Sequence, residues 1–182
     1  QWRWLFIYPE QGVATINEVR FPEKTPVEFE LTADAPMNGF WIPSLGGQVY
    51  AMAGMSSKLS LMADSVGEYN GSSSNISGEG YAGMSFKAIS MKKTDFDLWA
   101  RTSTKKTDRL DLEKYNQDLV SPSKEQGVKV YSLFDAELYN KIVMKYMHGG
   151  SEPHSPDKTD NHSEMKMDHD SSDPEHHMME TE

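Results

Sequence analysis

The sequence predicts a mainly β domain, a β-sandwich or Greek-key barrel, followed by a small helical extension and a disordered tail. Three observations predict this layout. Short apolar runs separated by turn signals fill the chain up to Met91, and apolar residues at helical spacing follow. Residues 151–182 contain no aromatic residue and no Val, Ile, Leu or Ala, too little apolar surface to offset their conformational entropy. We therefore divide the chain into residues 1–92, 93–150 and 151–182.

Four segments of the first part have the composition of β-strands. Residues 2–8 are aromatic and apolar, whereas residues 13–19, 27–31 and 58–61 alternate between apolar and polar side chains. Several short strands at this spacing are typical of a sandwich or barrel. The turn signals between them lie at residues 9–12, 21–26, 46–47, 64–67 and 70–74.

The second part has three helical faces. Thr94 is placed to cap a helix that carries Phe96 and Trp99. A strand-like segment at residues 128–134 precedes the last helix, at residues 136–147. Aromatic residues at helical spacing usually face a core, so we expect most of them to pack against the β domain. The other two faces consist of Leu110, Leu112, Tyr115 and Leu119, and of Leu138, Ile142, Val143 and Tyr146.

Charge and composition exclude several functions. The chain has a net charge of -10, which argues against a nucleic-acid partner. It has no Cys, which excludes disulfides, thiolate metal sites and Cys nucleophiles. No apolar run approaches the ~20 residues needed to cross a bilayer. Because the chain starts at Gln1 without a signal sequence, we expect it to be a piece of a longer protein.

Acid–base catalysis also lacks its usual residues. All six His residues lie at or after His148, so the β domain has no imidazole base or ligand. The carboxylates of residues 95–113 lie among lysines, which is typical of solvated helix faces. We assign them no catalytic role.

Two loops, at residues 37–46 and 71–86, are the most informative segments. The first reads Met-Asn-Gly-Phe-Trp-Ile-Pro-Ser-Leu-Gly, and the second has Gly71, Gly78 and Met84 in order. With Trp2-Arg3-Trp4 and residues 8–12, they resemble subunit II of the haem-copper respiratory oxidases, specifically of the cytochrome bo-type ubiquinol oxidases. The resemblance covers roughly residues 1–150 and implies a cupredoxin-like barrel, an aromatic-rich extension and a periplasmic domain.

The resemblance also locates a lost metal site. In the cytochrome c oxidase branch, the two loops hold a two-copper centre through one His and a Cys-x-Glu-x-Cys-x3-His-x2-Met pattern. A hydroxyl group cannot replace a bridging thiolate, and a lone thioether is a weak ligand, so we expect no metal in the barrel. This loss is what the quinol-oxidising branch shows. The corresponding positions here are Asn38, Ser73, Asn75, Ser77, Tyr81 and Met84.

What the resemblance implies about function is a structural role in a larger complex. That complex oxidises ubiquinol, reduces oxygen to water and pumps protons. Its haem and copper lie in the large membrane subunit, and this chain carries no cofactor and is not itself catalytic. Upstream transmembrane helices are expected to anchor the domain at the periplasmic face of the bacterial inner membrane. Candidate subunit contacts are Trp2, Trp4, Asn38 and Tyr81.

The tail offers a second hypothesis, a free periplasmic copper-handling module. Imidazole and thioether groups suit Cu(II) and Cu(I) respectively, which makes weak copper capture a candidate role. Equally, residues 151–182 carry 10 acidic and 2 basic residues, and a solvated acidic tail needs no metal. The candidate ligands are His162, Met165, Met167, His169, His176, His177, Met178 and Met179.

Overall fold

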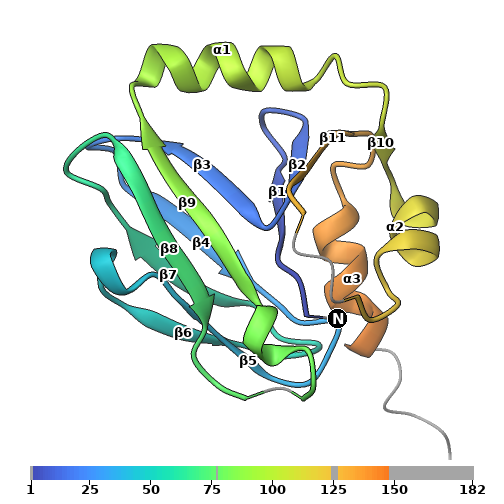
Figure 1. Ribbon diagram of the computed structural model, residues 1–182. Coiled ribbons are helices and arrows are strands. Elements are labelled where there is room, and N and C mark those ends of the chain that lie inside the picture. Colours follow the sequence, from blue (N-terminus) through green and yellow to red (C-terminus); the bar gives the residue numbers. More distant parts are fainter. Residues whose placement is uncertain (1, 77, 124–126, 148–182) are drawn as a thin grey trace, which may run out of the picture. The chain divides into compact units, whose positions relative to one another are not determined.

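The computed structural model describes residues 2–76, 78–123 and 127–147 (Figure 1). The predicted mainly β architecture is confirmed. No helix within the described ranges is long and apolar enough to cross a membrane. The predicted tail, residues 151–182, lies outside the described residues.

Three sheets make up the β domain. A five-stranded sheet has the order β3-β9-β8-β5-β6, a four-stranded sheet has the order β1-β2-β11-β10, and β4 pairs with β7. All pairs are antiparallel except β3 with β9 and β10 with β11. The strands are β1 Leu5–Tyr8, β2 Val13–Ile16, β3 Glu18–Pro22, β4 Val27–Leu31, β5 Asn38–Trp41, β6 Gln48–Ala51, β7 Ser57–Leu61, β8 Gly67–Ser73, β9 Ser85–Met91, β10 Arg109–Leu110 and β11 Lys129–Leu133.

An aromatic core fills the space between the sheets. Trp4 and Phe6, on the same face of the first segment, pack against Phe40 and Phe86, whose rings stack with centroids 5.2 Å apart. Gly71 faces this stack, and a Cβ there would lie 2.1 Å from the Phe86 ring. Glycine is therefore required because the aromatic ring occupies the space of a side chain.

A second core lies on the other face of β1 and β2. Leu5 and Ile7 alternate with Trp4 and Phe6 and pack against residues of the extension. Strand β11 pairs with β2, with Tyr131 opposite Ala14, so β2 has a strand on both sides and is buried throughout. The extension thus completes a sheet as well as covering it. Its helices are α1 Lys93–Ser103, α2 Leu112–Asp118 and α3 Leu138–Met147.

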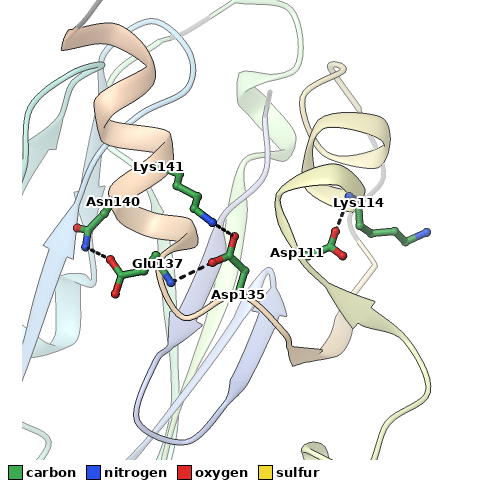
Figure 2. Close-up of polar contacts among 6 residues, drawn as sticks. All are labelled: Asp111, Lys114, Asp135, Glu137, Asn140 and Lys141. Atoms are coloured by element: carbon green, nitrogen blue, oxygen red, sulfur yellow. Dashed lines mark hydrogen bonds and ion pairs between the residues drawn. The ribbon is translucent and has the colours of Figure 1, made fainter.

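Acidic side chains hold the starts of two of these helices (Figure 2). Asp111 accepts a hydrogen bond from the Lys114 backbone N–H at 2.8 Å at the start of α2. Before α3, Asp135 accepts from the Glu137 N–H at 3.2 Å and from Lys141 Nζ at 2.8 Å. Each carboxylate satisfies a donor that has no partner within the helix.

Four details of the predicted elements were wrong. Most of the turn expected at residues 70–74 lies in strand β8, which runs to Ser73. The single strand expected at residues 13–19 is two strands, because Asn17 adopts a left-handed φ of 56° and its Oδ1 accepts from the Trp4 N–H at 2.9 Å. Leu110 lies in β10, because the helix begins only after Asp111. Thr94 does not cap α1, which begins at Lys93 without a side-chain cap.

Candidate functional site

The two loops singled out in the sequence lie side by side because their strands are paired. Strand β5 belongs to the first loop segment and β8 leads into the second, and Phe40 lies opposite Ser73. This pairing brings the side chains of Asn38 and Ser73 together, with Oδ1 and Oγ 3.3 Å apart. Both residues are buried.

Asn75 connects the two loops further. Its Nδ2 donates to the Met37 carbonyl at 2.7 Å, and its Oδ1 accepts from the Gly39 N–H. The Ser73 hydroxyl lies 3.1 Å from the Asn75 carbonyl, and the Ser74 N–H donates to the Gly39 carbonyl at 2.9 Å. A polar network therefore fills the space between the loops.

The other predicted positions surround this network. Met84 is buried in the aromatic core, and its carbonyl accepts from the Ser73 N–H at 3.2 Å. Tyr81 begins the short 3-10 turn η2, Tyr81–Gly83, and is half-buried. Ser77 lies outside the described residues. The structure thus brings Asn38, Ser73 and Asn75 together.

The donor atoms at these positions do not fit a two-copper centre. They are carboxamides, hydroxyls, a phenol and a thioether, with no thiolate to bridge two metal ions, because the chain has no Cys. The carboxamides of Asn38 and Asn75 are also engaged in hydrogen bonds, the former through Nδ2 to the Pro36 carbonyl at 2.7 Å. Within the part of the chain that the structure describes, no three His, Cys, Asp or Glu side chains gather as a metal site.

Two protein-family models match this chain. Residues 1–92 match the model of the cytochrome c oxidase subunit II periplasmic domain, and residues 105–150 match that of the COX aromatic-rich motif. The chain belongs to the subunit II periplasmic-domain family. The resemblance inferred from the two loops is confirmed, and the family supports a periplasmic location.

Individual relatives of this subunit II domain are quinol oxidase subunits. Cytochrome bo(3) ubiquinol oxidase subunit 2 of Pseudomonas putida is 49% identical over 145 residues, which cover 80% of this chain and 46% of the relative. The protein of the same name from Pseudomonas aeruginosa is 46% identical, with coverage of 82% and 45%. Ubiquinol oxidase subunit 2 of Acetobacter aceti is 41% identical, with coverage of 81% and 48%. The chain therefore spans about half the length of these relatives.

A solved structure supports the cupredoxin-like fold of the family. It is the crystal structure of the mixed disulfide intermediate between a thioredoxin-like protein and subunit II of cytochrome c oxidase. The match has a TM-score of 0.51 and 22% identity, and it covers 56% of this chain and 84% of that chain.

The four predicted contact residues of this subunit II domain differ in how far they are buried. Trp4 and Asn38 are buried, so their side chains add little to the surface of the domain. Trp2 is half-buried and its indole lies against the second loop, where a Cβ on Gly80 would come within 2.2 Å of the ring. Trp2 and Tyr81 are therefore the two predicted contact residues with partly exposed side chains.

Two exposed apolar residues at the same loops were not among the four predicted contact residues. Met37 is 45% exposed and Ile76 is 81% exposed, although both are apolar. Their signal was present, since an apolar residue at a loop tip has no core to enter. They adjoin the network, because Met37 provides the carbonyl that Asn75 contacts and Ile76 follows Asn75.

Asp34, three positions before the first loop, was also missed. Its side chain is 6% exposed and accepts from Tyr115 Oη at 2.8 Å, from Lys145 Nζ at 2.9 Å and from Tyr146 Oη. Burial works to raise the pKa of Asp34, but these hydrogen bonds outweigh it and hold the pKa below its ordinary value. The same contact raises the pKa of Tyr146 to about 12. Asp34 thus connects the segment before the first loop to α2 and α3 through hydrogen bonds.

The candidate copper ligands of the tail, from His162 to Met179, lie outside the described residues. Their assignment stays a prediction from composition.

Proposed function

We propose that this chain is the periplasmic domain of subunit II of a proton-pumping ubiquinol oxidase, with a structural role and no copper centre of its own. The observation that carries the proposal is its similarity, over four fifths of its length, to subunits named for ubiquinol oxidation. The donor set of the two loops supports it, because electrons from a membrane quinol need no copper entry site in this domain. In this proposal the haem and copper belong to the large membrane subunit, where ubiquinol is oxidised and oxygen reduced.

The loop face is the proposed contact with that large subunit. Met37, Ile76, Trp2 and Tyr81 place apolar and aromatic side chains on or near the two loops. Exposed apolar side chains of this kind are typical of protein interfaces, in which aromatic residues and Met are enriched. Upstream transmembrane helices of the longer protein would hold the domain on the periplasmic side of the inner membrane.

Purification of the tagged full-length protein from the membranes of its host tests this proposal. We expect a haem-containing complex that oxidises ubiquinol and consumes oxygen, and that does not oxidise cytochrome c. A protein that purifies without haem subunits, or a complex that oxidises cytochrome c instead, would contradict the proposal.

The family assignment favours the oxidase role over a free copper-handling module, because both matched segments belong to oxidase subunits. Weak copper capture by the tail is compatible with either role and remains a separate proposal, based on the His and Met content of residues 151–182.

A further inference from the structure

Asn38, Ser73 and Asn75, whose side-chain atoms do not fit copper, form hydrogen bonds between the two loops. We propose that Asn75 is a positioning residue, whose carboxamide fixes the two loops relative to each other at the place where copper-bearing relatives have a metal bridge. The inference deepens the proposed function, since these loops form the proposed contact with the large subunit.

The carboxamide contacts both sides of one residue in the first loop. Nδ2 donates to the carbonyl of Met37 at 2.7 Å, and Oδ1 accepts from the N–H of Gly39. The two contacted backbone groups flank Asn38. The Met37 carbonyl is an acceptor and the Gly39 N–H is a donor, so a side chain that binds both needs one donor and one acceptor. The planar carboxamide of Asn offers an acceptor oxygen and an N–H donor side by side without a change of protonation.

The surrounding contacts make the connection specific. Gly39 is held through its carbonyl as well, by the Ser74 N–H at 2.9 Å. A Cβ on Gly39 would come within 1.9 Å of Ser74 Oγ, so the close approach of the loops depends on glycine. Ser73 Oγ lies within hydrogen-bond reach of Asn38 Oδ1 and of the Asn75 carbonyl, at 3.3 and 3.1 Å.

The connection determines where two exposed apolar side chains lie. Met37 provides the carbonyl that Asn75 binds, and Ile76 is the next residue after Asn75. If the carboxamide is removed, the backbone segments that carry these side chains lose two of the hydrogen bonds between them, and the Ser74–Gly39 backbone hydrogen bond remains. A partner that docks on both then has to order them at the moment of binding, which costs affinity.

Amide hydrogen exchange measured by NMR tests the connection in the present chain. In Asn75→Ala we expect the Gly39 amide to exchange at least tenfold faster than in the wild type. In Asn75→Asp the acceptor for Gly39 remains but the donor to Met37 is lost. The Gly39 rate should then change less than threefold, while the Met37 and Asn38 signals shift.

Asn70→Ala is the matched control. Asn70 lies in β8, the strand that leads to Asn75, is exposed, and accepts from Lys87 Nζ at 2.9 Å, so its loss should leave the Gly39 rate unchanged. The amides of the β4–β7 pair report on global unfolding. Wild-type exchange of Gly39 in Asn75→Ala, or equal acceleration of Gly39 and the β4–β7 amides, would overturn the proposal.

A second measurement separates this inference from the proposed function. In the full oxidase complex, Asn75→Ala should release subunit II several-fold faster in a detergent wash than Asn70→Ala does. Faster Gly39 exchange with unchanged release would support the positioning role and contradict the loop face as the subunit contact. Unchanged Gly39 exchange contradicts the positioning role, whatever the complex does.

Discussion

The carboxylate of Asp34 connects segments that are far apart in the chain. Its hydrogen-bond partners are separated from it by 81, 111 and 112 positions, and they come from two different helices. The donors hold the pKa of Asp34 below its ordinary value. A carboxyl group whose pKa is depressed by folding adds stability above its unfolded pKa of about 3.9, and this stability is lost as the pH falls through the folded value.

Asp34→Asn therefore has a pH-dependent cost. At neutral pH we expect the free energy of unfolding to fall by about 2–3 kcal/mol, because an amide cannot replace a buried carboxylate that is bound by three donors. The difference between wild type and variant should shrink as the pH falls below about 4, because the unfolded carboxyl takes up a proton there while the folded one keeps its charge to lower pH. Urea unfolding between pH 7 and pH 3 measures both the loss of stability at neutral pH and its decrease at low pH.

The control for this experiment is Asp64→Asn, at an exposed carboxylate between β7 and β8. We expect it to change stability by less than about 0.5 kcal/mol at any pH. If the difference in free energy of unfolding between wild type and Asp34→Asn does not change with pH, the stabilising role of the Asp34 charge is contradicted.

No local signal in the sequence predicts the role of Asp34. The segment Thr32-Ala33-Asp34-Ala35-Pro36 has the composition of an ordinary polar turn. The contacts of Asn75 were equally hidden, because its partners Met37 and Gly39 are 38 and 36 positions away. The sequence pattern located the loops and the missing ligands, whereas the hydrogen bonds that replaced them depend on the tertiary fold.

Among the elements, α3 depends on Asp135, which lies three positions before its first residue. Asp135→Ala removes the hydrogen bond to the Glu137 N–H and the contact with Lys141 Nζ (Figure 2). We expect a loss of about 1 kcal/mol, the usual cost of removing a helix cap, measured by thermal unfolding followed by circular dichroism.

Glu137→Ala is its control, because Glu137 contacts Asn140 at 2.8 Å through its side chain without capping the helix (Figure 2). This variant should cost less than about 0.5 kcal/mol. An equal cost for both variants would show that the cap of Asp135 adds nothing.

The two loops carry a prediction of their own, the recovery of a metal centre. Restored ligands should bind two copper ions and give a coloured product, because the loops are already adjacent through the β5–β8 pairing. Optical absorption and paramagnetic resonance detect the centre, and the wild-type chain is the colourless control. A well-folded variant that stays colourless would contradict the alignment of the loops. The substitutions are Asn38→His, Ser73→Cys, Asn75→Glu, Ser77→Cys and Tyr81→His, with Met84 kept.

Alternation and helical spacing predicted the three helices and strands β1, β2, β4, β7 and β11, but they did not predict β5, β6, β8 or β9. They also failed where a single residue changes the backbone direction. Residues 13–19 were predicted as one strand, but Asn17 turns the chain so that β2 and β3 join different sheets. Leu110 fits the spacing of a helical face, yet it pairs with Leu133 in a parallel ladder. Periodicity detects which side chains are buried, and it cannot detect which partner strand is nearby.

For the whole molecule, the predicted boundary at residue 92 marks a change in composition, but side chains from both of its sides pack into the second core. The helical extension supplies strand β11 to the sheet of β1 and β2, and its Leu110 and Leu138 are completely buried in the second core. Burying side chains of this size contributes about 1.5–3 kcal/mol each. Helical spacing located the three helices of the extension, whereas nothing local in the sequence shows that its strand pairs with β2.

Copper binding by the whole chain is the last prediction, and it separates the loops from the tail. Residues 1–147 contain no His and no Cys, whereas the tail carries the imidazole and thioether groups named above. We expect the complete chain to bind copper weakly and residues 1–147 to bind none, in parallel titrations followed by paramagnetic resonance. Because thiolate is absent, the bound copper should show no intense charge-transfer colour. If residues 1–182 give no signal of bound copper, copper capture by the tail is disproved. Tight copper binding by residues 1–147 would contradict the conclusion that the loops cannot hold a metal.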